Sequence, residues 1–357
     1  MTVGALRDPD GYAFTTEGAG WVGNGVRDRF TPSGPTRFAD AAAWASEALA
    51  PDDVAFAAFT FDGSPGSALV VPEEVHAVRT DSAPPPDLGR VDGRIRYAGS
   101  SVDEVAWMEA VATATTRIRA GAYEKIVLAR DLQVWAADEL DPIGLAARLA
   151  RRFPSCMTFL HERFVGSTPE LLLRRDGRRV TSVVLAGTAA PDPASGRALL
   201  ASAKDQAEHA FARDSALAAL APSCVELHAD AEPWLLRLDN LQHLATRVTG
   251  LLDADHHVLE LVGAMHPTAA VGGTPRDVAV ADIRPLEQMD RARYAAPIGV
   301  VTGSGDGTFG IALRCAQLDG NRARLFAGCG IVADSLPDDE LEETRLKLQA
   351  MQSVLAA

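Results

Sequence analysis

The spacing of hydrophobic residues distinguishes predicted strands from predicted helices along this chain. Val54–Phe61 and Ala68–Val71 are short apolar runs of the kind found in buried strands. Residues 198–220 are instead rich in Ala and Leu and contain neither Gly nor Pro. This stretch predicts one uninterrupted helix, because its residues have high helix propensity.

A helix and a strand are predicted on the two sides of Gly121. Ser101 and Glu104 match the S-x-x-E pattern of a capping box, and hydrophobic residues then follow at helical spacing until Gly121. The run 124–130 is apolar on both faces, which predicts a buried strand. Alternation along that strand places Lys125 on the same side as two apolar residues, so Lys125 is a candidate buried amine.

Further strands and a final helix are predicted toward the C-terminus. Residues 163–166 and 171–173 form two strands that meet at a turn containing Glu170, and residues 182–186 form a strand that ends at Gly187. The last predicted elements are a hairpin of residues 309–318 and 322–326 around Asp319-Gly320-Asn321, and a helix over residues 338–355.

This order of elements predicts an α+β fold. Large antiparallel β-sheets would form a sandwich-like core, with helices packed outside. Residues 1–95 are rich in Gly, Pro and Asp, and we expect them to form peripheral strands of the same domain. Residues 96–357 contain the charged and glycine-rich segments with candidate chemistry.

The composition is that of a globular protein, with 47% hydrophobic and 23% charged residues in 357. A formal net charge of −14 disfavours binding to nucleic acids or anionic membranes, since both are polyanions. No stretch reaches the ~20 apolar residues of a membrane span, and the start of the chain lacks a signal-peptide pattern. We therefore expect a cytoplasmic protein. Four widely spaced cysteines indicate neither a disulfide framework nor a zinc site.

Charged residues at helical spacing are candidate metal ligands. Glu340, Glu343 and Lys347 fall on one face of the predicted C-terminal helix. Lys204 and Glu208 lie four residues apart on the earlier helix. Solvent-exposed helix faces also contain such pairs, so the spacing alone favours a surface role. Carboxylates that converge from two helices would suit Mg²⁺, which binds a few carboxylates together with waters and an anionic ligand.

Two other side chains are candidates for acid–base chemistry. Lys125, desolvated in an apolar strand, would have a lowered pKa and act as a base; the alternative is a buried stem with its ammonium group in water. Glu170 stands at the edge of an apolar strand, where a raised pKa suits a general acid; the alternative is an ordinary turn carboxylate. The chain contains no dinucleotide fingerprint, P-loop or G-x-S-x-G elbow, so nucleotide binding and serine hydrolysis are not supported.

Eight segments, in order, resemble the conserved blocks of the chorismate-utilising enzymes, which include isochorismate, salicylate, anthranilate and aminodeoxychorismate synthases. The resemblance extends from about Tyr123 to Leu348, and it places a chorismate-binding catalytic region within residues 96–357. The blocks read Tyr123-EKIVLAR, Phe164-VGSTPELLLR, Leu185-AGT, Lys204-DQAEH, Leu241-QHLAT, His266-PTAAVGGTP, Ile311-ALRCAQL and Phe326-AGCGIVADS, the last leading into Glu340-LEETRLKL.

The resemblance implies a role for each matching residue. Glu208 and Glu343 match ligands of Mg²⁺, the implied cofactor, and Glu340 stands close by. Lys125 matches the base that activates the attacking water, and Glu170 matches the acid that protonates the departing hydroxyl. The implied substrate-binding positions are Leu185, Gly187, Thr188, His243, Thr246, Arg314, Gly328, Gly330 and Lys347.

Three positions favour the isochorismate synthase branch of this family. Ammonia-using members have Gln where this chain has Lys125, so the resemblance implies water as nucleophile and no glutamine amidotransferase subunit. Ala186 stands where aminodeoxychorismate synthases typically have a nucleophilic Lys. Salicylate synthases usually read H-L-G-S where this chain has His243-Leu244-Ala245-Thr246. The implied reaction converts chorismate to isochorismate by water attack at C2 with loss of the C4 hydroxyl.

Two alternatives to this function are open. A salicylate synthase would form isochorismate and then eliminate pyruvate, and a non-catalytic protein of the same fold would bind a ligand without turnover. Retention of both acid–base residues and both metal ligands disfavours the second. One departure from the family pattern is Ala296, where a glycine is more common, and it affects local backbone packing. We expect a monomer that functions in menaquinone or siderophore biosynthesis.

Overall fold

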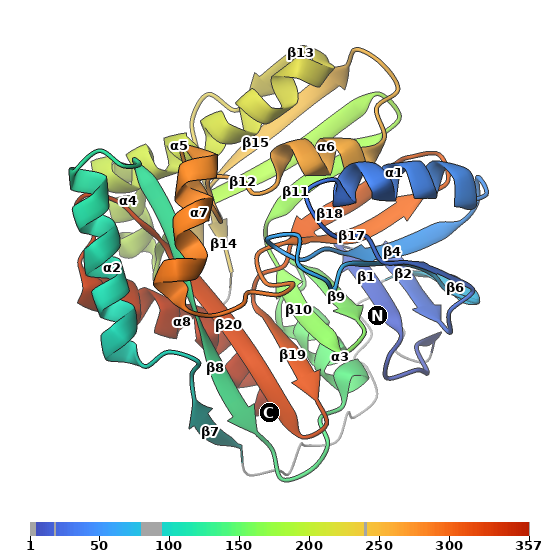
Figure 1. Cartoon of the computed structure of the whole chain (residues 1–357), viewed down its shortest axis with the longest axis horizontal. Helices are drawn as coiled ribbons and strands as arrows, with labels where there is room; N and C mark the ends of the chain where they lie inside the picture. Colours follow the sequence, from blue (N-terminus) through green and yellow to red (C-terminus); the bar gives the residue numbers. More distant parts are fainter. Residues whose placement is uncertain (1–4, 18, 80–94, 239–240, 357) are drawn as a thin grey trace.

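The computed structural model of the chain describes residues 5–17, 19–79, 95–238 and 241–356. Within these residues the strands form two sheets of 10 strands each, and every strand pair is antiparallel. Helices pack around both sheets (Figure 1). The predicted α+β fold with large antiparallel sheets is confirmed.

Each sheet combines strands that are far apart in the sequence. The first sheet contains, in order of pairing, β16 (Gly273–Thr274), β8 (Lys125–Trp135), β20 (Arg322–Ile331), β19 (Cys315–Asp319), β10 (Phe164–Thr168), β9 (Met157–His161), β1 (Tyr12–Thr16), β2 (Ala19–Asn24) and β6 (Glu74–Arg79), with β7 (Arg96–Gly99) also paired to β8. The second contains β13 (Cys224–Ala229), β15 (Gln242–Leu252), β12 (Arg179–Ala189), β11 (Leu171–Asp176), β18 (Gly307–Ile311), β17 (Pro297–Thr302), β4 (Val54–Ala58), β5 (Ala68–Val71) and β3 (Asp28–Phe30), with β14 (Trp234–Arg237) also paired to β15. The N-terminal strands therefore extend one end of each sheet.

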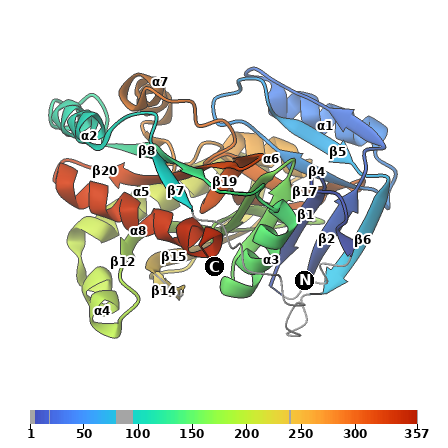
Figure 2. The ribbon, with the colours of Figure 1, turned by 90° about the horizontal axis from the view of Figure 1, so that it is seen from below.

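Eight α-helices are present in the described residues: α1 (Arg37–Ala48), α2 (Glu104–Arg119), α3 (Pro142–Arg152), α4 (Pro193–Ala201), α5 (Ala203–Leu220), α6 (Val258–Met265), α7 (Arg276–Glu287) and α8 (Pro337–Leu355). Helix α8 packs against β20, and α5 packs against β12 and β15 (Figures 1 and 2). Helices α1 and α6 pack against each other beside the second sheet (Figure 1). In the part of the chain that the structure describes, no helix is long and apolar enough to span a bilayer.

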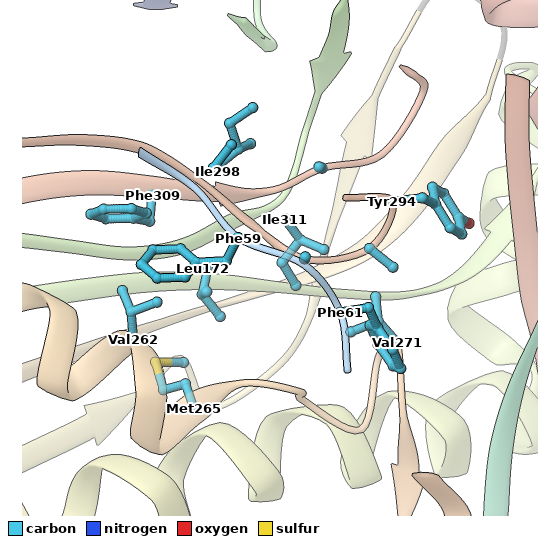
Figure 3. Packing of buried hydrophobic residues seen from close by; sticks show 14 of the residues in the cluster. Phe59, Phe61, Leu172, Val262, Met265, Val271, Tyr294, Ile298, Phe309 and Ile311 are labelled. Atoms are coloured by element: carbon cyan, nitrogen blue, oxygen red, sulfur yellow. The ribbon is translucent and has the colours of Figure 1, made fainter. Parts of the chain in front are cut away.

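The larger hydrophobic core includes residues of both sheets, and part of it lies between the second sheet and α6. Phe59, Leu172 and Phe309 are buried there together with Val262 and Met265 of α6 (Figure 3). Burying a large apolar side chain contributes about 1.5–3 kcal/mol. Because Phe59 follows β4, the N-terminal region contributes directly to the core that supports the rest of the molecule.

The predicted single helix over residues 198–220 is wrong, because the chain forms two helices there. Helix α4 ends at Ala201 and α5 begins at Ala203. Ser202, between them, has an extended backbone, and its side chain accepts a hydrogen bond from the Asp205 backbone N–H at 3.2 Å. A serine cap of this kind starts a new helix, and here it outweighs the high helix propensity of the flanking residues.

The predicted capping box at Ser101 and Glu104 is also wrong. The N-cap of α2 is Asp103, whose side chain accepts a hydrogen bond from the Ala106 backbone N–H at 2.8 Å. Ser101 instead donates to the carboxylate of Asp131, with 2.6 Å between the two oxygens. The Ser101 hydroxyl therefore joins the start of α2 to β8.

Two predicted strands have different limits in the structure. Strand β12 does not end at Gly187 but continues to Ala189, with a shift of register between Ala186 and Thr188. Gly187 accommodates this bulge because it has a φ of +76°, which favours glycine. Residues 309–318 are divided between β18 and β19, which belong to different sheets. The hairpin turn at Gly320 and the C-terminal helix are confirmed.

Candidate active site

Two of the places where the chain crosses from one sheet to the other are neighbours in space. One crossing joins β10 to β11 through Glu170, and the other joins β18 to β19 through Arg314. The Ser167 backbone N–H donates to the Arg314 carbonyl at 3.2 Å, and the Ile311 N–H donates to the Glu170 carbonyl at 3.1 Å. These bonds hold the two crossings side by side, so Glu170 and Arg314 are positioned by the fold itself.

A small cavity, partly open to solvent, lies beside these crossings. It brings together residues from both sheets and from α5 and α8. The predicted site residues that line it are Glu170, Leu185, Gly187, Thr188, Glu208, His243, Arg314, Gly328, Gly330, Glu343 and Lys347. Lys125, Thr246 and Glu340 are not among the lining residues and lie behind them.

Lys125 lies directly behind the cavity wall. Its side chain is 1% exposed, and its Nζ is 3.1 Å from Oε1 of Glu208, which is on α5 and lines the cavity. Among the described residues, the ammonium group has no hydrogen-bond partner besides this ion pair. A Cβ on Gly330 would come within 2.3 Å of Glu208 Oε1, so only glycine leaves room for this arrangement.

Helix α8 directs its charged face toward the cavity rather than toward solvent. Glu343 and Lys347 pair at 2.6 Å, and Lys347 Nζ donates to the Gly328 carbonyl at 2.8 Å. Glu340, one turn earlier, is only 3% exposed and lies 3.6 Å from Lys204 of α5. The predicted single face of α8 is therefore present; Glu340 is buried, and Glu343 and Lys347 are partly buried.

Carboxylates from α5 and α8 approach one another at this face. Burial, with a further contribution from the charge of Glu343, raises the pKa of Glu340. Burial lowers the pKa of Lys204, but the negative charges of Glu340 and Glu208 outweigh it, and the net shift is upward. The region thus has a concentration of negative charge that favours a cation.

Glu170 is a buried carboxyl group beside the cavity, with 4% of its surface exposed. Burial raises its pKa to about 7, against the opposing effects of a backbone hydrogen bond at Leu185 and the positive charge of Lys125. A carboxyl group with this pKa is partly protonated near neutral pH. It has the property that a general acid requires.

Arg314 and His243 form a buried polar pair in the cavity wall. Nη2 of Arg314 lies 3.2 Å from Nε2 of His243, and Nδ1 of His243 lies 3.2 Å from the Gly187 carbonyl. Burial lowers the pKa of His243 well below its usual value, so the ring is neutral and accepts from Arg314. Arg314 has a φ of +47°, a rare backbone conformation that the crossing between sheets imposes on it.

Thr246, a predicted substrate-binding residue, contacts another buried histidine instead of the cavity. Its hydroxyl lies 2.7 Å from Nε2 of His209 on α5. Burial lowers the pKa of His209 to about 4, so this ring is also neutral. The contact joins β15 to α5 next to Glu208.

Several cavity residues were missed by the sequence analysis. Tyr294 lines the cavity, and its ring is stacked on that of Phe326 at 5.2 Å. Arg291 also lines the cavity and is almost fully buried. Tyr294 belongs to the segment around Ala296 that was interpreted only as a departure in backbone packing, and Arg291 was not singled out. An aromatic residue and an arginine three residues apart, shortly before β17, were the available signal. The other missed lining residues are Val127, Pro169, Ala186, Ala270, Val271, Ala295, Leu313 and Cys329.

The donor groups at this site suit a hard divalent cation bound partly by the protein. No cluster of three or more His, Cys, Asp or Glu side chains within the described residues is placed to hold a metal ion. Glu208 and Glu343 nevertheless both line the cavity. Mg²⁺ typically binds through one or two carboxylates, with water and substrate oxygens completing its shell. The carboxylates present therefore fit Mg²⁺ better than a metal that needs a full protein cage.

This cavity is lined by a protonatable carboxyl group, a lysine and an arginine, and a buried lysine lies behind its wall. Such a set of groups suits acid–base chemistry on a small anion. Residues 73–356 match the family described as chorismate binding enzyme. Because this match covers more than half of the chain, the chain belongs to the chorismate-binding enzyme family. The resemblance based on eight sequence blocks is thereby confirmed.

Known proteins similar to this chain include isochorismate synthases. Isochorismate synthase MenF of Bacillus subtilis is 37% identical over 281 residues, which is 76% of this chain and 59% of that protein. The chain thus spans less than two thirds of that relative. The MenF protein of Mycobacterium tuberculosis is 36% identical over 356 residues, or 94% of this chain and 93% of that protein. The crystal structure of DhbC from Bacillus anthracis aligns with a TM-score of 0.91 at 29% identity, covering 99% and 98% of the two chains.

Proposed function

We propose that this protein is a Mg²⁺-dependent isochorismate synthase, which converts chorismate to isochorismate. The observation that carries the proposal is the buried Glu170, whose pKa is about 7, at a cavity that is also next to the buried Lys125. An acid and a base at one site suit a reaction in which one hydroxyl enters a ring and another leaves it.

The reaction balances without an oxidant or reductant. The oxygen of a water molecule forms a bond to C2 of the ring, and Lys125, reacting as the neutral amine, takes one proton from that water. The electron pairs of the two ring double bonds shift from C1–C2 to C1–C6 and from C5–C6 to C4–C5. The bond from C4 to its hydroxyl breaks, and Glu170 gives that hydroxyl a proton, so water leaves. One water enters and one leaves, so the reaction is an isomerisation.

The cations of the cavity match the two carboxylates of chorismate. Arg314 is held by its contact with His243, and Lys347 is held by the Gly328 carbonyl. Both therefore present their charge in a fixed geometry, which orients an anionic ligand more effectively than flexible surface lysines do. Gly328 and Gly330 of β20 line the cavity, and the missing side chain of Gly330 leaves room for the Lys125–Glu208 pair.

Glu208 and Glu343 would hold Mg²⁺, with Glu340 behind them. When bound, the ion would neutralise the acidic region and bind the ring carboxylate of the substrate. The two glutamates come from α5 and α8, so the site would be complete only in the folded chain. Thr246 would act indirectly, because its contact with His209 positions the helix that carries Glu208.

The proposal includes no glutamine amidotransferase subunit, because water rather than ammonia is the nucleophile. We also propose that the enzyme is a monomer and that its product enters menaquinone or siderophore biosynthesis. Similarity to isochorismate synthases supports the activity, and it does not by itself favour a salicylate synthase.

The purified protein incubated with chorismate tests the proposal. Isochorismate, salicylate and pyruvate are separated by chromatography, with added Mg²⁺ in one reaction and EDTA in the other. Isochorismate formed only with Mg²⁺ is the expected result. Salicylate together with pyruvate would assign the chain to the salicylate synthases, and no turnover under any condition would favour a non-catalytic binding protein.

A further inference from the structure

A buried ion pair lies at the end of α7, where Arg291 also lines the cavity. Glu287 is the last residue of α7, and Arg291 follows it by four residues. Their side chains are 0% and 3% exposed. Nη2 of Arg291 lies 2.5 Å from Oε1 of Glu287, and Nε lies 3.0 Å from Oε2, so the contact is bidentate. Such a pair is costly to desolvate unless its remaining donors and acceptors are used.

The remaining donors and acceptors of this pair bind the backbone of β8 and of the loop before β16. The Ala129 N–H donates to Oε1 of Glu287 at 2.6 Å. Arg291 Nη2 donates to the Val127 carbonyl at 2.8 Å, and Nη1 donates to the Val271 carbonyl, also at 2.8 Å. The Glu287–Arg291 pair thus connects α7, a cavity-lining loop and the strand that begins with Lys125.

This contact occurs where β8 has no neighbouring strand on one edge. Strand β16 pairs only with the first two residues of β8, and β7 pairs only from residue 133 onward. Between them, no strand of the described residues pairs with this edge of β8. The Val127 N–H donates to the Gly272 carbonyl, and Trp107 Nε1 donates to the Ala129 carbonyl at 3.1 Å. Side chains therefore replace the hydrogen bonds of a missing strand.

Val127 and Ala129, the two β8 residues that hydrogen-bond to the Glu287–Arg291 pair, lie directly opposite the glycines of the cavity wall. On the other edge of β8, Val127 is paired with Gly330, and Ala129 is paired with Gly328. Lys125 lies two residues before Val127 on the same strand. A displacement of this part of β8 therefore moves the proposed base and the backbone of the substrate site together.

We propose that Glu287 and Arg291 are positioning residues, which fix β8 so that Lys125 and the Gly328–Gly330 wall keep the geometry of the reaction. This inference rests on the proposed function. The pair acts through the strand backbone and does not take part in proton transfer. Misplacement of reacting groups by about 1 Å can lower a rate about 10²-fold, so the expected effect is on kcat.

The test compares Arg291→Lys and Glu287→Gln with the wild-type enzyme. Lysine keeps the charge of Arg291 but cannot bind Glu287, Val127 and Val271 together. We expect kcat to fall about 10²-fold with the KM for chorismate changed by less than about threefold. Glutamine keeps an acceptor for Ala129, so Glu287→Gln is expected to retain more activity than Glu287→Leu. A raised KM with unchanged kcat would overturn the proposal, because Arg291 would then act as a substrate contact.

Arg175→Lys is the matched control for lost stability. Arg175 is also a buried arginine with a carboxylate partner, 2.9 Å from Asp306, but it lies in β11 away from the cavity. We expect Arg175→Lys to lower Tm without lowering kcat. If Arg291→Lys and Arg175→Lys lower activity equally at matched loss of Tm, the pair has only a structural role.

Amide hydrogen exchange separates this inference from the proposed function. The expected result is exchange about tenfold faster in a peptide that covers residues 124–130 of Arg291→Lys, with peptides from β9 and β10 unchanged. Unchanged exchange in residues 124–130 would overturn the positioning role. An enzyme preparation without isochorismate formation would refute the proposed function, and the exchange data would still decide whether the pair fixes β8.

Discussion

Lys125 and Glu208 contact each other at 3.1 Å, although the lysine belongs to a strand and the glutamate to a helix 83 residues later in the chain. This contact connects the proposed base to a proposed Mg²⁺ ligand. It depends on Gly330, because a Cβ there would lie 2.9 Å from Lys125 Cε and 2.3 Å from Glu208 Oε1. The base, the metal ligand and the glycine are therefore one geometric unit.

Gly330→Ala is expected to separate Lys125 from Glu208. The added methyl group meets both side chains, so we expect kcat to fall at least about tenfold. The unfolding free energy should fall by about 1–3 kcal/mol, as at other overpacked sites, and Tm should fall with it. Steady-state kinetics and thermal unfolding check this. Gly320→Ala is the control, since Gly320 has a φ of +55° with no atom near its Cβ position and lies in the β19–β20 turn. Gly320→Ala should lose stability only. Full activity in Gly330→Ala would contradict the proposed dependence of the Lys125–Glu208 contact on Gly330.

Lys125→Met is expected to remove the base while filling the same space. The rate should fall about 10²–10⁴-fold, the usual contribution of a general base. Lys204→Met is the matched control, because Lys204 pairs with Glu340 but is 44% exposed. Rates of isochorismate formation at saturating chorismate and Mg²⁺ compare the two. Equal losses in both variants would show that any lysine near the acidic region suffices.

The raised pKa of Glu170 leads to two predictions, one for the pH dependence of the rate and one for the pH dependence of stability. Its pKa is raised to about 7 by burial, so the acid form is lost as pH rises through 7, and the acid-dependent rate should decline above that value. Between pH 4.5 and 7 the folded state keeps a proton that the unfolded chain releases. Stability therefore falls as pH rises across this range, by about 3 kcal/mol in total.

Glu170→Gln separates these effects from other titrations. The variant cannot donate a proton or titrate, so we expect a rate about 10²–10⁴-fold lower, together with a flatter dependence of unfolding free energy on pH from 4.5 to 7. Denaturant unfolding at several pH values measures the difference from wild type. An identical pH dependence in the two proteins would mean that Glu170 is ionised throughout.

Glu343 and Glu342 provide a paired test of Mg²⁺ binding on one helix. Glu343 lines the cavity, whereas Glu342 is 62% exposed and pairs with Arg345. We expect Glu343→Gln to raise the Mg²⁺ concentration needed for half-maximal activity by about tenfold or more, and Glu342→Gln to leave it unchanged. A Mg²⁺ titration after removal of metal with EDTA checks both. Equal requirements in the two variants would contradict the assignment of Glu343.

The sequence predicted which residues share one face of a helix or strand better than it predicted how those elements pack together. The strand that begins at Lys125 and the shared face of Glu340, Glu343 and Lys347 follow from local periodicity. Whether that helix face is buried does not, because its burial depends on contacts with β20 and α5, which are distant in the sequence. Local spacing therefore favoured a solvent-exposed face, and only the family resemblance indicated that these residues belong to the active site.

Other differences have identifiable physical causes. Ser202 interrupts a stretch of high helix propensity because a side-chain cap starts a second helix there. The crossings between sheets place a non-glycine residue, Arg314, at a positive φ, which no local pattern indicates. The Glu287–Arg291 pair was missed because a charged pair at helical spacing usually lies at a surface. These are sites where tertiary contacts outweigh local preference.

The most direct test of the account is the origin of the new hydroxyl group. Chorismate is converted by wild-type protein with Mg²⁺ in water enriched in ¹⁸O, and the isochorismate is analysed by mass spectrometry. If Lys125 activates water, the isochorismate made by the wild-type enzyme carries one ¹⁸O atom in its C2 hydroxyl. Lys125→Met should then form no labelled product, because its turnover is lost. Isochorismate without the label would contradict it, because the hydroxyl would then have moved within the substrate instead of coming from water activated by Lys125.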